Sequence, residues 1–266
     1  MSTRDAQEWE GLTTVEVDAL LAQDPVVVLP LAAIEQHGPH LPLSTDLEIG
    51  LGIVRAAFRA LPDGFPASRL PAQTLGTSAE HRSFPGTLSL DPETMTSIIC
   101  GVGRSLAGAG VRRLVLSNSH GGNRAAMSTA GLRLREEEGL LVITASYFDF
   151  DPPEGVKIPD GEWRHGLHGG AVETAMMLHL RPDLVRSQRR ARALSLGEDL
   201  EAAGSRIAPT GPASFSWLAE DLNASGAVGD ATLGNAEDGK RLVEHYGGIL
   251  ADVIRDTQTF PMERLG

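Results

Sequence analysis

Apolar runs and amphipathic stretches alternate along the chain. The run 25–34 (PVVVLPLAAI) is continuously apolar, which is typical of a strand buried on both faces of a sheet. Strands separated by helices indicate a mostly parallel sheet joined by crossovers. We therefore expect one domain over residues 1–266, with the α/β class and a three-layer α/β/α sandwich. Further strands are predicted at 68–75, 111–117 and 140–148.

Helices are predicted where apolar residues recur every three or four positions. In 46–60, Leu47, Leu51 and Val54 share one helical face. The helix at 91–109 opens with Asp-Pro, a capping side chain followed by proline at the first helical position. Other helices are expected at 14–23, capped by Thr13 or Thr14, at 124–138, ended by Gly139, at 170–180 and at 236–257.

Two long stretches, 149–167 and 197–230, follow neither period and are expected to be irregular. Irregular segments of this length in a compact domain are usually lids, binding loops or subunit contacts. No internal repeat or low-complexity tract interrupts the alternation of strands and helices. We therefore expect these two stretches to serve one of those three roles.

The composition restricts the partners. Hydrophobic residues make up 41% of the chain, charged residues 22%, and the net charge is −12. Such a surface repels nucleic acids and anionic membranes, so neither is expected to bind. No apolar run approaches the about 20 residues that span a bilayer. The polar stretch 1–11 has no apolar signal region, which favours the cytoplasm. The only cysteine, Cys100, is expected to be a buried small hydrophobe.

The most informative polar segment follows the first apolar strand. Glu35 and His37 are two residues apart, so they point the same way if the extended geometry continues. Asp46 stands at the start of the next helix, where a lone aspartate is more often a cap. Pro39 and Pro42 stiffen the intervening loop, which favours a built site. Carboxylates and imidazoles converging at a strand end are typical ligands of Zn, Mn or Fe.

A second polar segment, SNSHGGN at 117–123, joins a predicted strand to a helix. His120 is therefore expected at the carboxyl edge of the sheet. Gly121 and Gly122 let the backbone approach a ligand closely and offer amide donors at a helix N-terminus. A phosphate cradle is the weaker interpretation, because the spacing matches neither a dinucleotide fingerprint nor a P-loop and the segment has no lysine.

The segment 165–177 carries histidines into a predicted helix. Glu173 lies in the first turn, on a face continued by Met176 and Met177. A carboxylate on an apolar face is costly unless it is paired or metal-bound, but the helix dipole also favours a first-turn glutamate. His168, just before the helix, is a candidate proton shuttle, although a lone histidine is more often structural.

A polar, loop-like segment, GTSAEHRSFPGT, occupies 76–87. Ser78, Glu80 and His81 within it are able to hydrogen-bond a small ligand. An ordinary surface loop accounts for the segment equally well.

The acids and imidazoles suffice for two divalent transition-metal ions. Glu35, Asp46 and His120 are expected to hold one ion. His37, Asp46 and Glu173 are expected to hold the second, with Asp46 as the bridge. Three protein ligands for each ion leave positions for water and substrate, as in two-metal hydrolases. A serine triad is the chemical rival, but the chain has no G-x-S-x-G elbow.

Four ordered segments resemble the creatininase (creatinine amidohydrolase) family: EQHGPHLPLSTD at 35–46, SAEHRSFPGT at 78–87, NSHGGN at 118–123 and HGGAVET at 168–174. A weaker similarity, VGDATLGNAEDGK, lies at 228–240. The resemblance implies an α/β/α fold, two ions of Zn, Mn or Fe, and hydrolysis of a cyclic or linear amide C–N bond in a small molecule. It also implies a homo-oligomer, often a hexamer.

The resemblance assigns roles to single residues. Those that match family metal ligands are Glu35, His37, Asp46 and His120, while His168 matches a catalytic histidine. Ser78 matches a family substrate contact. The further substrate contacts that we expect are Glu80, His81, Gly121, Asn123 and Trp163. Creatininase reads His-Tyr-Glu-Asn where this chain has HGGN, so its glutamate ligand is missing and Glu173 is expected to replace it. Arg164 stands where creatininase has a tryptophan near its substrate. Both departures argue against creatinine as the substrate.

Other activities accompany amide hydrolysis in the family that the chain resembles. They include deformylases of flavin-type cofactor synthesis, a peptidase that matures a peptide-derived redox cofactor, and sugar-ring hydrolases. We expect a metal-dependent hydrolase of an amide or cyclic amide, with the peptidase, a sugar-ring or lactone hydrolase, and a non-catalytic metal-bound scaffold as the alternatives. The presence of Glu35, His37, Asp46, His120 and His168 argues against the scaffold.

Overall fold

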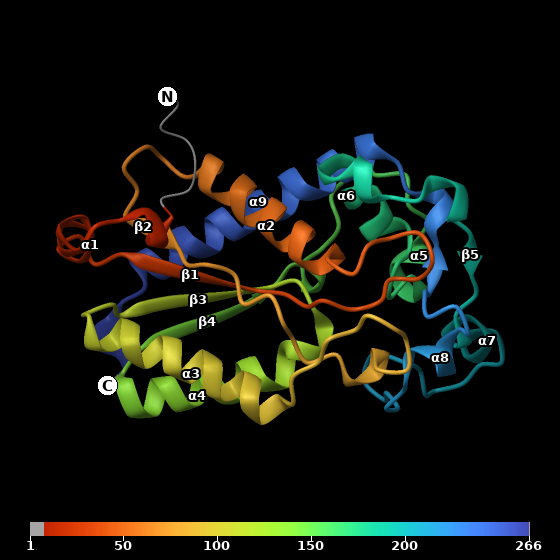
Figure 1. Ribbon diagram of the computed structural model, residues 1–266, viewed down its shortest axis with the longest axis horizontal. Helices are drawn as coiled ribbons and strands as arrows, with labels where there is room; N and C mark the ends of the chain where they lie inside the picture. Colours follow the sequence, from red (N-terminus) through yellow and green to blue (C-terminus); the bar gives the residue numbers. More distant parts are fainter. Residues whose placement is uncertain (1–7, 266) are drawn as a thin grey trace.

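A four-stranded parallel sheet forms the centre of the molecule, with helices on both faces (Figure 1). The computed structural model describes residues 8–265. Most of the polar stretch 1–11, on which the expected absence of a signal region depends, lies outside this range. The strand order is β2-β1-β3-β4, and every neighbouring pair is parallel. The strands are β1 (Val26–Leu31), β2 (Ala67–Arg69), β3 (Arg113–Asn118) and β4 (Leu141–Ser146).

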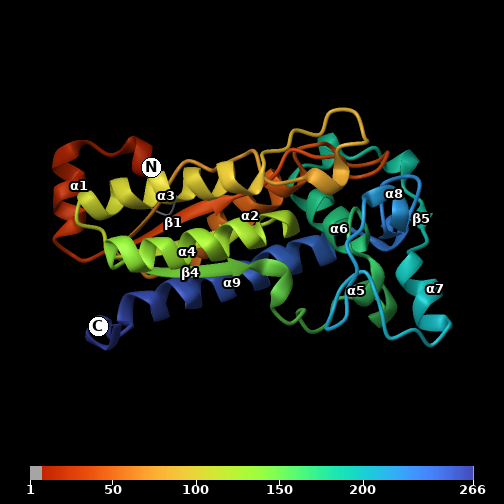
Figure 2. The same cartoon turned by 90° about the horizontal axis from the view of Figure 1, so that it is seen from below.

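Successive side chains of a strand point to opposite faces, so β1 contributes to two cores. The covering helices are α2 (Thr45–Ala60), α3 (Pro92–Gly108), α4 (Arg124–Glu138), α6 (Ala171–Leu180) and α9 (Ala236–Thr259). Val26 and Val28 lie in the core beneath α2, α6 and α9, whereas Val27 and Leu29 lie in the core beneath α3 and α4. Figures 1 and 2 show these helices on opposite sides of the sheet. This arrangement confirms the predicted three-layer α/β/α sandwich.

Local signals set the ends of several helices. Thr13 caps α1 (Thr14–Leu21) in a capping box with Glu16. Asp91 accepts the Thr94 N–H at 2.8 Å and so caps α3. Gly139 ends α4 in the left-handed region, with φ of 68°. The predicted positions of these three helices are therefore confirmed.

Two expectations were wrong in part. The strand predicted at 68–75 is only three residues long, because Pro71 has no N–H for the ladder; pairing returns at Gln73, which bridges Leu31. The stretches expected to be irregular contain short elements. These are α5 (Asp160–His165), α7 (Leu196–Ala202), α8 (Ala219–Leu222) and β6 (Gly229–Asp230), which pairs antiparallel with β5 (Arg192–Ala193).

The short elements gather at the end of the molecule toward which the sheet strands run (Figure 1). The 3-10 turns of the chain include η2 (Ala79–His81) and η3 (Gly121–Asn123), which lead into the same region. Cys100 is buried in α3, as expected for a small hydrophobe. Within residues 8–265, no helix has both the length and the hydropathy that a bilayer-spanning segment requires. The fold thus gathers loops and short helices at the carboxyl edge of the sheet.

Candidate metal centre and active site

Five acidic and imidazole side chains converge at the carboxyl edge of the sheet. Glu35 and His37 follow β1, and His120 follows β3. Asp46 and Glu173 lie in the first turns of α2 and α6. Glu173 is half-buried, and the other four are almost completely buried. Elements far apart in the sequence therefore deliver these groups to one place.

The five side chains form two overlapping groups, in each of which the potential ligand atoms lie within 4.8 Å of one another. One group is Glu35, Asp46 and His120, and the other is His37, Asp46 and Glu173, as the sequence predicts. Asp46 Oδ2 lies 3.3 Å from His120 Nδ1, and Asp46 Oδ1 lies 3.2 Å from His37 Nε2. Asp46 thus turns one oxygen toward each imidazole, which is the geometry of a bridging carboxylate.

Two features of this cluster suit a divalent cation: carboxylate oxygens without a hydrogen-bond partner, and the hydrogen bonds of the histidine rings. Glu35 Oε2 and Asp46 Oδ2 are buried and have no hydrogen-bond partner, which is costly unless a cation satisfies them. His120 Nε2–H donates to the Thr77 carbonyl at 2.8 Å, and His37 Nδ1–H donates to the Glu35 carbonyl at 3.0 Å. Because a carbonyl only accepts, the neutral form of each ring would present the lone pair of its other nitrogen to the carboxylates, where a metal could bind. This oxygen and nitrogen donor set suits Zn, Mn or Fe.

The carboxylates and imidazoles of this cluster shift one another's pKa. Burial disfavours the charged form of His37, but the carboxylates of Asp46, Glu173 and Glu35 raise its pKa to about 10. Burial likewise opposes charge on His120, and Glu35 and Asp46 raise its pKa well above the ordinary value. Burial raises the pKa of Glu173 to about 7 against the opposing charge of His37. Protons therefore occupy nitrogens that a metal would need.

We expect metal affinity to rise with pH for this reason. His37 has a pKa of about 10, so a metal must displace its proton at neutral pH. Apparent affinity should then rise up to about tenfold per pH unit for each proton displaced. Competition with a chromophoric chelator at several pH values measures this slope. The control variant is His245→Ala, which replaces a partly buried histidine bonded to the Asp151 carbonyl and should leave the slope unchanged. A flat wild-type profile would contradict the assignment.

His168 lies between two other histidines at the edge of the cluster. Its ring centroid is 4.1 Å from that of His37 and 4.2 Å from that of His81. Its Nε2–H donates to the Gln36 carbonyl at 2.5 Å, so the Nδ1 lone pair faces Glu35 Oε1 at 3.8 Å. Burial lowers the pKa of His168 well below its usual value, assisted by the charges of His37 and His81. The ring is thus a neutral base, and with Glu35 and His37 it also forms a third potential ligand group.

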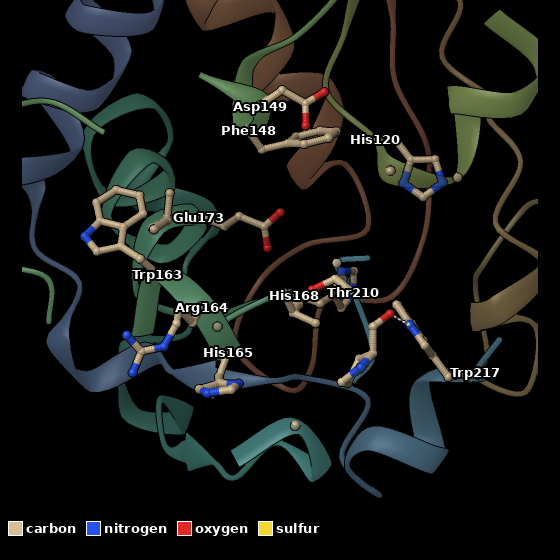
Figure 3. A pocket seen from close by; sticks show the side chains of 18 of the residues that line it. His120, Phe148, Asp149, Trp163, Arg164, His165, His168, Glu173, Thr210 and Trp217 are labelled. Carbon is tan, nitrogen blue, oxygen red and sulfur yellow. Dashed lines mark hydrogen bonds between the residues drawn. The ribbon is translucent and has the colours of Figure 1, made fainter. Parts of the chain in front are cut away.

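A cavity of about 1150 Å³ opens in front of these groups. Figure 3 shows Glu173 and His168 pointing into it, with Phe148, Trp163 and Trp217 around its margin. The outer wall comes largely from the stretches that the sequence left irregular, and Trp217 is held there by donating from Nε1 to the Pro209 carbonyl at 2.9 Å. Phe148, Trp217 and Arg124 were not predicted as cavity residues: Phe148 and Trp217 belong to no motif, and Arg124 lies just after the segment 117–123.

The predicted substrate contacts divide into two sets. Those that line the cavity are Glu80, His81, Gly121 and Trp163. Ser78 and Asn123 are not among the lining residues that the structure describes. Ser78 Oγ lies 3.4 Å from His120 Nε2, while the Asn123 amide donates to Ala32 O at 3.1 Å and accepts the Thr77 N–H at 3.0 Å. Both therefore support the surrounding loops, and their role as substrate contacts stays a prediction.

Gly122 is required by close packing. A Cβ there would lie 2.0 Å from Thr77 O, 2.5 Å from His120 Nε2 and 3.0 Å from Glu80 Oε1. The backbone leaves no room for the glutamate that creatininase has in its His-Tyr-Glu-Asn segment. Glu173 instead brings a carboxylate to the cluster, with Oε1 3.9 Å from His37 Nε2.

Comparison with known proteins supports the resemblance to the creatininase family along most of the chain. The model of the family Creatininase, creatinine amidohydrolase, matches residues 10–254. The mycofactocin precursor peptide peptidase of Mycobacterium tuberculosis (strain CDC 1551 / Oshkosh) is 32% identical over 248 residues, covering 89% of this chain and 86% of that protein. The creatinine amidohydrolase of Pseudomonas putida is 35% identical over 195 residues, covering 65% of this chain and 72% of that protein.

Solved structures give the same result. The structure named "Creatininase Mn" has a TM-score of 0.76 and 28% identity, covering 96% of this chain and 100% of that one. A creatininase mutant of "Zn-Zn type" has a TM-score of 0.73 and 29% identity, covering 95% of this chain and 98% of that one. With the family model matched over residues 10–254 and this fold, the chain belongs to the creatininase (creatinine amidohydrolase) family of hydrolases.

Proposed function

We propose that the protein is a metal-dependent amidohydrolase that cleaves an amide or cyclic amide C–N bond in a small molecule. Glu35, Asp46 and His120 would hold one divalent ion, and His37, Asp46 and Glu173 would hold the other. The observation that carries the proposal is the sharing of Asp46 by both groups, beside partnerless carboxylate oxygens on a cavity wall. The manganese and zinc forms of creatininase support Zn or Mn, and Fe suits the same donors.

Such ions, when bound, acidify water and polarise a carbonyl. In this proposal His168 moves the proton: Nδ1 would accept it from the attacking water and then deliver it to the leaving nitrogen, and the contacts of the ring support this role. The leaving nitrogen needs that proton because an amide anion is a very poor leaving group. The Gln36 carbonyl holds Nε2–H throughout, so one nitrogen performs both transfers. Glu80 and His81 on the cavity wall would orient the substrate.

The test combines metal analysis with a substrate panel. We expect purified protein to carry up to about two transition-metal ions per chain. The metal-loaded protein should hydrolyse some members of a panel of formamides, cyclic amides and linear amides, followed by mass spectrometry. Chelator treatment should abolish this activity, and added Zn²⁺ or Mn²⁺ should restore it. No more than trace metal in active, chelator-free protein would end the proposal.

A peptidase is the second candidate. The cavity of about 1150 Å³ is larger than the about 300–1,000 Å³ of usual small-molecule pockets. Mycofactocin precursor peptide peptidases match most of this chain, and a peptide bond is itself an amide. The same ligands and His168 would therefore serve. Faster cleavage of short peptides than of any small cyclic amide in the panel would select the peptidase.

Creatinine turnover is expected to be weak or absent. Gly121 and Gly122 stand where creatininase has tyrosine and glutamate, and Arg164 stands where it has tryptophan. Arg164 is exposed and lies 3.4 Å from Glu201, so it would offer the creatinine ring a charged side chain in place of an aromatic face. The measurement is kcat/KM for creatinine against the best amide of the panel. Creatinine hydrolysis at about 10⁴ M⁻¹s⁻¹ or faster would overturn this expectation.

Homo-oligomeric assembly and a cytoplasmic location stay predictions.

A further inference from the structure

The Glu162 carboxylate joins the N-terminus of α6 to β6. Its Oε1 accepts the Ala171 N–H at 2.7 Å, and its Oε2 accepts the Asp230 N–H at 2.8 Å. Ala171 is the first residue of α6, whose N-cap residue is Gly170 and which has no capping side chain of its own. Glu162 therefore supplies from α5 the cap that α6 lacks, and a negative charge there also suits the helix dipole.

The loop that presents His168 adjoins both attachment points: it leads into Ala171 and pairs with Val228, close to Asp230. The His168 N–H donates to the Val228 carbonyl at 3.3 Å, and the Val228 N–H donates back at 2.6 Å, two residues before Asp230. The next residue in the chain, Gly169, donates its N–H to Glu173 Oε2 at 2.5 Å. A shift of either attached segment would therefore move both the imidazole and the Glu173 carboxylate.

Three glycines enclose the Glu162 carboxyl group. A Cβ at Gly166, Gly170 or Gly229 would lie 2.3, 2.5 and 2.5 Å, respectively, from Glu162 Oε1. Gly229 also has φ of 125°, a conformation that favours glycine. The three backbones thus approach the carboxyl group so closely that it has one place to lie. A carboxylate built into a fixed position and bonded to both flanking segments is suited to orienting them.

We propose that Glu162 is a positioning residue for hydrolysis, which holds His168 and Glu173 in place relative to the other potential metal ligands. This inference rests on the proposed function. Glu162 is not among the cavity-lining residues that the structure describes, so it acts through the groups it holds. A misplacement of about 1 Å in a catalytic group costs up to about 10²-fold in rate, so loosening this loop should be visible in kcat.

The test uses Glu162→Ala and Glu162→Gln in the metal-loaded protein. Glu162→Ala should lower kcat about 10- to 100-fold, the range for loss of a group that orients ligands, with KM and metal content nearly unchanged. Glu162→Gln keeps one acceptor oxygen and should recover part of the rate. The matched control is Asp238→Asn: Asp238 is buried in α9 and accepts from Asn235 Nδ2 at 2.8 Å and from the Lys157 N–H at 3.4 Å. It should lower the Tm without lowering kcat.

Hydrogen exchange separates failure of this inference from failure of the proposed function. Glu162→Ala should speed amide exchange in 168–171 and 228–230, and Asp238→Asn should not. A wild-type protein that cleaves no amide of the panel refutes the proposed function, and unchanged exchange in Glu162→Ala would then refute the positioning role as well. In an active protein, wild-type kcat in both Glu162 variants, or an equal fall of kcat in Asp238→Asn, would overturn the inference.

Discussion

Replacing Asp46 with alanine is expected to remove both metal ions and to reduce hydrolysis to the level of chelator-treated protein. Asp46 is the member common to the two ligand groups, with one oxygen directed to His120 and the other to His37. Its loss would leave each group with two ligands and would remove the charge that offsets both cations. Glu35→Ala or His37→Ala breaks one group and should chiefly weaken one ion.

Elemental analysis after exhaustive dialysis measures this difference. We expect about two ions per chain in the wild type, close to none in Asp46→Ala, and about one in Glu35→Ala or His37→Ala. Asp91→Ala is the matched control, because Asp91 caps α3 in an exposed position and should keep the full metal content. Equal and partial loss of metal in all three site variants would count against the bridge.

The layers of the fold were predictable because burial leaves a direct pattern in the sequence. The run 25–34 is apolar throughout since β1 is covered on both faces, and the amphipathic stretch 46–60 becomes a helix with one buried face. In a parallel sheet the residues after each strand meet at one edge, so Glu35, His37 and His120 were expected to lie together. Position in the fold, more than the motif letters, explains that success.

The outer wall of the cavity was not predictable in the same way. The helices α5, α7 and α8 are too short for a periodic pattern to be read, and α8 has only four residues. Contacts such as Trp217 with the Pro209 carbonyl depend on how a loop folds back on itself. The contacts of the His168 ring with the rings of His37 and His81 join three segments far apart in the chain. No local spacing encodes such a contact.

The reason why glycine occupies position 122 is visible only in the three-dimensional structure. In the sequence it reads as a glycine that lets the backbone approach a ligand. In the structure the close neighbour is the Thr77 carbonyl, 2.0 Å from where a Cβ would lie. The glycine therefore serves the packing of two loops against each other, and a glutamate at this position would not fit with the loops where they lie.

His168→Ala is expected to keep its full metal content while kcat falls about 10²-fold or more, the size expected for loss of a general acid–base. The five other residues would already give each ion three ligands, so a sixth ligand would fill a position that water and substrate need. The geometry agrees with proton transfer: Nε2–H is held by the Gln36 carbonyl, and Nδ1 is free beside Glu35. The lowered pKa keeps the ring neutral at physiological pH, so it is ready to accept a proton.

A second buried histidine provides the matched control for this variant. The His40 ring bonds to Thr174 Oγ1 at 2.9 Å through Nε2, and His40 is not among the cavity-lining residues within 8–265. His40→Ala should therefore lower the Tm without the loss of kcat. If His168→Ala instead loses metal, then His168 is a ligand in the third group with Glu35 and His37, and the assignment of Glu173 must be reopened. If the variant keeps both metal and rate, His168 only orders the loop before α6.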